Sequence, residues 1–165
     1  MNRHSMLTLT TMTLLCLGAF SNARADETLK FRLIAHLAAV QTQDVGDVDG
    51  HTMSVGRYSG LASFPDGSVG TTNFTFTTDY IKGAGTFLTY YNLTLKDGSM
   101  LSYKQSGTAK LEGTSTIFPD APLSVLRGTG RFEGAKGDGN SNGARLTPIA
   151  IGAELYVDVV INVKK

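Results

Sequence analysis

Hydrophobic and polar residues alternate along much of the chain, and the alternation is cleanest at its C-terminal end. In residues 154–165 every second position is apolar over most of the segment. A period of two places these side chains on one face of an extended strand and the polar ones on the other. The pattern predicts a final strand that is buried on one face. Its apolar positions are Leu155, Val157, Val159, Ile161 and Val163.

Two Asp-Gly turns divide the middle of the chain into hairpins. Asp66-Gly67 and Asp97-Gly98 each separate two alternating segments. This is a strong hairpin signal, because both residues tolerate the positive φ that a tight turn requires. The result is a four-strand meander, an order found in barrels and sandwiches. The predicted strands are residues 54–64, 69–80, 86–95 and 99–110.

Both faces of these strands carry apolar residues. In residues 86–95, Phe87 and Tyr91 lie on one face, and Leu88 and Tyr90 lie on the other. A barrel within an oligomer would bury both faces, one inside and one against a neighbouring subunit.

The other segments give weaker signals. Residues 29–40 fit a strand or one short helix, and the polar Asp/Gly loop that follows favours a strand. Residues 111–118 predict a short strand closed by a Pro-Asp-Ala-Pro segment. Residues 138–143 imitate the opening of a calcium loop, but Ile149 stands where a bidentate glutamate is needed. A solvated turn is therefore favoured there.

A glycine-dense stretch in residues 125–139 precedes this turn. Glycine suits backbone that turns sharply or closely approaches another strand, so a sheet corner is the favoured interpretation. A nucleotide loop is the alternative, but the spacing is GxGxxxG and no Gly-Lys-Ser/Thr follows. The glycines are Gly128, Gly130, Gly134, Gly137 and Gly139.

Residues 1–25 are typical of a secretory signal. Arg3 precedes a mostly apolar core, and Ala23-Arg24-Ala25 supplies small residues for cleavage. The apolar run is too short to span a bilayer. We therefore expect a secreted or periplasmic protein without a membrane span, with one domain over residues 26–165. Cleavage would remove Cys16, the only cysteine.

The charge balance gives no reason to expect binding to nucleic acid or to an anionic membrane surface. Loss of Arg3 and Arg24 from 15 basic residues leaves 13 against 14 acidic ones, a net charge of −1. Binding to a polyanion depends on an excess of basic residues, which this balance does not provide.

The glycine-dense stretch carries a family resemblance. LRGTGRFEGAKGDG, followed by AELYVDVVINV, resembles the C-terminal third of the allene oxide cyclase barrels, where a GGSGxFEGAxG-type segment precedes the last strand. It resembles more loosely the GGTGxFxxARG segment of plant dirigent proteins. The match covers roughly a quarter of the chain. The resemblance implies an all-β fold, an eight-stranded antiparallel closed barrel of calycin-type shape with an apolar interior, assembled as a homo-oligomer (trimer or dimer).

The resemblance does not transfer a catalytic residue. Allene oxide cyclases place a glutamate on the first strand, and dirigent proteins carry an aspartate at a comparable point. Residues 29–43 contain no acidic residue, and His36 is the nearest polar group to that place. The catalytic residues are therefore unknown from the sequence.

Familiar catalytic constellations are absent from the sequence. It has no GxSxG motif, and only His36 and His51 remain outside the signal, so neither a hydrolytic triad nor a zinc site is expected. No cofactor is predicted. A barrel offers instead an apolar cavity whose few polar groups hold a flexible ligand in one reactive geometry, which by itself accelerates ring closure.

Candidates for the cavity lining are polar and aromatic residues of the predicted strands. The sequence does not fix which of them point inward, because one bulge would reverse a strand's phase. The candidates are His36, Arg57, Tyr58, Asn73, Tyr90, Tyr91, Tyr103, Lys104, Arg127 and Tyr156.

Three functions stay open at this point. The first is an exported barrel that binds a small apolar molecule and isomerises or cyclises it. The second is a carrier of the same shape without chemistry. The third is a structural or assembly barrel filled by its own side chains. A cavity on the order of several hundred Å³ with convergent polar groups would separate the first two from the third.

Overall fold

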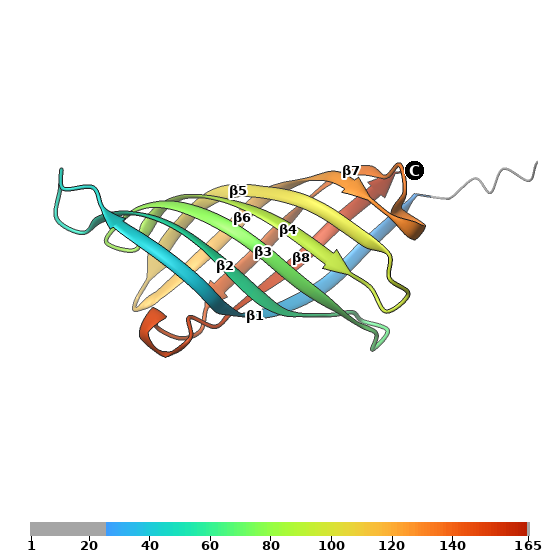
Figure 1. Cartoon of the computed structure of the whole chain (residues 1–165), viewed down its shortest axis with the longest axis horizontal. Coiled ribbons are helices and arrows are strands. Elements are labelled where there is room, and N and C mark those ends of the chain that lie inside the picture. The colour runs from blue at the N-terminus through green and yellow to red at the C-terminus, as the bar shows by residue number, and fades with distance from the viewer. Residues whose placement is uncertain (1–25, 165) are drawn as a thin grey trace, which may run out of the picture.

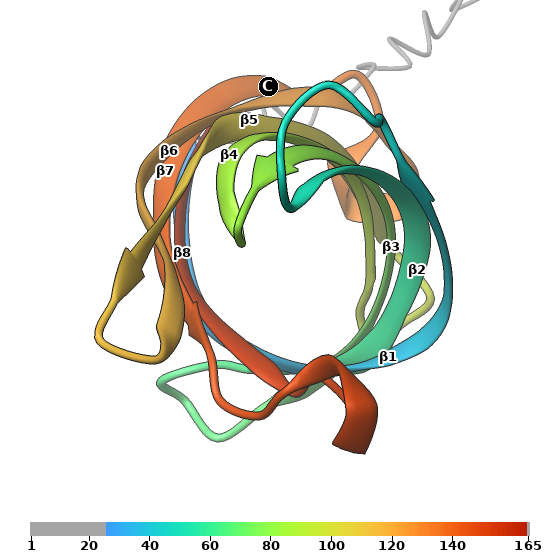
Figure 2. The ribbon, with the colours of Figure 1, turned by 90° about the vertical axis from the view of Figure 1, so that its left-hand side faces the viewer.

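The computed structural model describes residues 26–164, which form one closed antiparallel barrel. Each strand pairs with the next, and the last pairs with the first to close the ring (Figure 2). The long strands run obliquely along the barrel (Figure 1). This confirms the predicted eight-stranded antiparallel barrel. The strands are β1 (Glu27–Asp44), β2 (His51–Ser63), β3 (Val69–Ile81), β4 (Ala84–Thr94), β5 (Met100–Glu112), β6 (Ser115–Gly128), β7 (Lys136–Arg145) and β8 (Leu155–Lys164).

The two Asp-Gly hairpins form as predicted. Gly67 and Gly98 adopt φ values of 82° and 81°. In each turn the aspartate side chain accepts a hydrogen bond from a backbone N–H two residues later, at 2.9 Å for both Asp66 and Asp97. These Asx turns fix the register of the β2–β3 and β4–β5 hairpins locally.

Alternation sorts the side chains between the interior and the outer surface. On β8 the predicted apolar positions are all buried, with Ile161 fully so. On β3 Phe74 and Tyr80 are buried, whereas Asn73, Thr75 and Thr77 are exposed. The inward apolar residues form one large core cluster and a smaller one of Tyr80, Phe87, Ala109 and Ala121.

The predicted strand over residues 111–118 is wrong. β5 continues to Glu112, the chain turns at Gly113, and β6 then runs through both Pro119 and Pro122. A break in register between Phe118 and Ala121 marks a bulge there. A bulge accommodates prolines, which have no N–H to donate to a neighbouring strand.

The predicted turn over residues 138–143 is also wrong, because these residues form the middle of β7. Its glycines let the backbone approach β8 closely. A Cβ atom on Gly139 would lie 2.0 Å from the carbonyl oxygen of Val160. Before β7, the glycine-dense stretch turns through the short 3₁₀ helix η1 (Gly130–Phe132), which buries Phe132 completely.

The predicted signal of residues 1–25, with Cys16, lies outside the described residues. Within residues 26–164, no helix has both the length and the apolar composition needed to cross a membrane.

His51, the first residue of β2, links the loop between β1 and β2 to strand β3. The Nδ1 atom of His51 lies 2.5 Å from Asp47 of the loop, and its Nε2 atom lies 2.7 Å from Asp79 of β3. Hydrogen bonds to Asp79 and then to Asp47 raise the pKa of His51 above its ordinary value of 6.5. When protonated, the ring donates a hydrogen bond to each carboxylate.

This contact predicts a pH-dependent contribution to stability. A raised pKa in the folded state adds stability that is fully present below pH 6.5 and is lost as the pH rises through the raised value. We expect His51→Gln to lower the melting temperature more at pH 5.5 than at pH 8.5. An equal effect of His51→Gln at both pH values would contradict this account.

Candidate functional site

One half of the barrel interior is filled by its own side chains. This half lies toward the β2–β3 and β4–β5 turns, where η1 also packs. The side chains that fill it have no exposed surface. This half therefore matches the filled barrel that the sequence left open as one of three possibilities. The filling side chains are Leu33, Leu93, Leu101, Tyr103 and Phe132.

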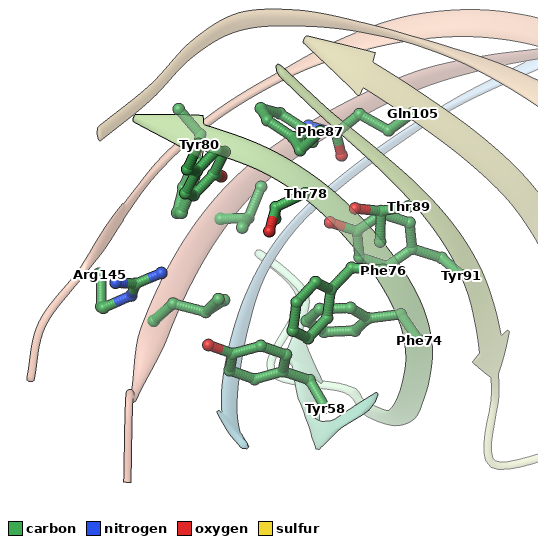
Figure 3. Close-up of a pocket in the computed structure, with 13 residues that line it drawn as sticks. Tyr58, Phe74, Phe76, Thr78, Tyr80, Phe87, Thr89, Tyr91, Gln105 and Arg145 are labelled. Atoms are coloured by element: carbon green, nitrogen blue, oxygen red, sulfur yellow. The ribbon is translucent and has the colours of Figure 1, made fainter. Parts of the chain in front are cut away.

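The opposite half contains a pocket that is partly open to solvent. Its cavity is about 50 Å³, and residues from β2 through β8 line it. Figure 3 shows most of the lining side chains converging from the surrounding strands. The lining consists of Tyr58, Phe74, Phe76, Thr78, Tyr80, Phe87, Thr89, Tyr91, Gln105, Phe118, Arg145, Leu155 and Val157.

A row of aromatic rings forms one wall of the pocket and continues into the core. Tyr58, Phe74, Tyr91 and Tyr103 are direct cross-strand neighbours on β2, β3, β4 and β5. Successive ring centroids lie 4.9, 4.5 and 4.7 Å apart. Such pairs are each worth about 0.5–1.5 kcal/mol beyond their buried area. The register of four strands therefore builds a continuous stack of aromatic rings.

Polar groups interrupt this apolar lining at a few points. Gln105 is 2% exposed, and its Oε1 atom has no hydrogen-bond partner. The Nε atom of the half-buried Arg145 is likewise buried without a partner. A buried polar atom without a partner costs about 1–3 kcal/mol. Both groups are therefore prepared to bind something that enters the pocket.

The phenols of the pocket stay protonated at neutral pH. Burial raises the pKa of Tyr80 to about 12. Burial also raises the pKa of Tyr58, while the neighbouring guanidinium of Arg145 partly offsets the rise. A protonated phenol donates a hydrogen bond, so Tyr58 and Tyr80 can act as donors toward a bound molecule.

The structure places three of the predicted lining residues inside the barrel. Tyr58 and Tyr91 line the pocket, and Tyr103 lies in the core directly behind Tyr91. The others do not line it, because each falls in the outward phase of its strand. These outward residues are His36, Arg57, Asn73, Tyr90, Lys104, Arg127 and Tyr156.

Two of the outward residues have partners on the outer surface. Asn73 accepts a hydrogen bond from Ser59 at 2.8 Å. The guanidinium of Arg32 lies 5.0 Å from the centre of the Tyr156 ring while it binds Asp158 at 2.7 Å. These contacts account for both side chains without a ligand.

Sequence reasoning missed Gln105 and Arg145. Gln105 lies two residues after Tyr103, so alternation along β5 places both side chains on the same face. Because Tyr103 was a candidate for the lining, this spacing could have identified Gln105. Arg145 was missed because the residues before it were interpreted as a turn rather than as strand β7. Among the described residues, no cluster of three or more His, Cys, Asp or Glu side chains is suited to a metal ion.

Comparison with known proteins gives matches of structure only. No protein-family model matches the chain, and no curated protein matches it. The pterocarpan synthase dirigent protein PsPTS1 matches with a TM-score of 0.55 at 14% identity, over 86% of this chain and 96% of that one. The pterocarpan synthase dirigent protein GePTS1 matches with a TM-score of 0.54 at 13% identity, over 94% and 96%.

At these identities the matches concern the fold alone. The resemblance to allene oxide cyclases stays a prediction. The chain has the eight-stranded barrel fold that dirigent proteins also have.

Proposed function

We propose that this protein is an exported barrel that binds a small apolar molecule in the aromatic pocket. The observation that carries the proposal is the contrast between the two halves of one interior. One half is filled by its own side chains, whereas the other keeps a cavity that aromatic side chains, Gln105 and Arg145 line. Apolar lining with a few placed polar groups is typical of small-molecule sites.

The cavity limits how much of a ligand it encloses. Pockets for drug-sized molecules usually measure about 300–1,000 Å³, and this cavity measures about 50 Å³. It is therefore smaller than the several hundred Å³ that would by itself separate a binding barrel from a filled one. The ligand therefore inserts one ring or the end of an apolar chain, and its remainder lies outside the cavity. Of the β3 residues in the lining, Phe76 and Thr78 are partly buried, whereas Phe74 and Tyr80 are buried.

Cyclisation or isomerisation of the ligand is a second candidate function. The protonated phenol of Tyr58 beside the guanidinium of Arg145 favours it. A phenol can donate a proton or a hydrogen bond, and a guanidinium stabilises negative charge that develops on an oxygen. A ligand held among the aromatic side chains of the pocket also loses conformational freedom before it reacts. A carrier without chemistry would use the same pocket.

Export and self-association are part of the same proposal. Residues 1–25 support export by their signal-like pattern. Apolar side chains on the outer surface support a homo-oligomer, since Ile34 is 53% and Leu61 is 56% exposed on neighbouring strands. The molar mass of the mature protein, measured by light scattering, distinguishes a monomer from a dimer or trimer.

Filling the pocket should abolish binding without unfolding the barrel. Thr78 lines the pocket, whereas Thr77 points outward from the same strand. We expect Thr78→Leu to weaken the binding of p-cresol at least 10-fold in calorimetric titrations, because the added carbons occupy the cavity. Thr77→Leu is the matched control and should bind like the wild type. Equal binding by both variants would place the ligand elsewhere.

A further inference from the structure

Arg145 is the single charged residue in the described lining of the pocket. None of the ion pairs among residues 26–164 includes it. Glu154, next to the cross-strand partner of Arg145, binds Thr147. The guanidinium is half-buried and contacts the Tyr58 hydroxyl, and its Nε atom is buried without a partner. A partly desolvated cation without a counter-charge favours an anion that enters beside it.

Gln105 supplies a hydrogen-bond acceptor, whereas the guanidinium of Arg145 only donates. Its Oε1 atom accepts hydrogen bonds and has no partner, although the side chain is 2% exposed. An acceptor buried in this way favours a ligand that carries a hydroxyl or N–H donor on its inserted end.

The two groups lie on different sides of the pocket. Figure 3 shows Gln105 beside Phe87, and Arg145 on the other side, near Tyr58 and Tyr80. Aromatic side chains of β2, β3 and β4 line the same pocket. The pocket thus presents an acceptor, a cation and several aromatic rings to one ligand.

We propose that the ligand is a hydroxylated aromatic acid, with its hydroxyl on Gln105, its ring among the aromatic side chains of the pocket and its carboxylate on Arg145. This inference rests on the proposed function and names the chemical class of ligand. A neutral hydrocarbon of the same shape leaves both polar groups without partners, so it binds more weakly. The carboxylate distinguishes this class from phenols that carry no charge.

The test compares matched probes by calorimetric titration at pH 7.5. Toluene carries neither group and p-cresol carries the hydroxyl. The 4-hydroxyphenyl acids with zero, one and two methylenes before the carboxylate carry both groups and vary their separation. Each acid is compared with its own amide, which keeps the size and removes the charge. We expect at least one acid to bind 10-fold or more tightly than its amide.

Three variants assign this difference to the two residues. Arg145→Met should remove the preference of acid over amide, whereas Arg145→Lys should restore part of the preference. Gln105→Met should remove the preference for p-cresol over toluene. Melting temperature and circular dichroism identify any variant that does not fold, and the wild-type series stands without the variants.

The possible failures are distinguishable. If toluene and p-cresol bind but no acid binds more tightly than its amide, the inference is overturned and the proposed function stands. If Arg145→Met keeps the full preference, the cation is not the carboxylate's partner and the inference is overturned. If no probe binds, toluene included, the proposed function itself fails.

Discussion

Gly139→Ala is expected to destabilise the barrel by about 3 kcal/mol, the upper part of the range for overpacking. The new Cβ atom would lie 2.0 Å from the carbonyl oxygen of Val160 and 2.9 Å from the Cα atom of Ile161. Both are backbone atoms of the paired strand β8, so no side chain can rotate to make room. The measurement is the free energy of unfolding from denaturant titration.

Gly98→Ala is the control for this prediction. A Cβ atom on Gly98 meets nothing within 4 Å, and the residue has a φ of 81°. The substitution adds no clash and costs about 1–2 kcal/mol through its left-handed backbone alone. If Gly139→Ala unfolded at the same denaturant concentration as the wild type, the close approach of β7 to β8 would be wrong.

Phe132→Ala should cost about 3–5 kcal/mol, the usual range for removing a buried phenylalanine. The Phe132 ring is fully buried at the filled end of the barrel, where η1 carries it inward. Its loss leaves a cavity among rigid strands, which collapse poorly around the empty space. The expected result is a large fall in the denaturation midpoint with an unchanged slope.

Arg131→Ala provides the matched comparison on the same short helix. Arg131 is exposed and lies with its guanidinium 4.8 Å from the centre of the Phe132 ring. Its removal loses an exposed cation–π contact worth about 0.5–1 kcal/mol. Equal effects of the two substitutions would show that Phe132 does not fill the barrel end.

Much of the fold was predictable because its signals are local. Alternation in residues 154–165 and the turns at Asp66-Gly67 and Asp97-Gly98 depend on neighbouring residues, and all three agree with the structure. β7 was not predictable in this way. Its inward positions include Gly139 and Ser141, which are small and lack the apolar alternation that marks a strand.

The path of β6 was also unpredictable, for a different reason. Pro119 usually ends a strand, and here a bulge at Asp120, with a φ of 43°, lets the strand continue. The N–H of Asp120 is satisfied by the side chain of Asn142 at 2.9 Å. This compensation comes from β7, which is distant in sequence.

The site was partly predictable at the level of residue type. Tyr58 and Tyr91 belong to the predicted lining and do face the pocket. His36 does not, because Ala35 takes the inward phase of β1. The phase of each strand depends on where the ring closes and where bulges fall, and both are tertiary properties. Arg145 could be assigned to the pocket only from the pairing of β7 with β8, which places it opposite Leu155.

A crystal structure of the mature protein grown with p-cresol tests the central claim most directly. The account predicts electron density for the ring between Phe74, Phe87 and Tyr91, with the hydroxyl within hydrogen-bond distance of the Gln105 side chain. Side chains that close the cavity completely, with p-cresol bound only on the outer surface, would contradict it.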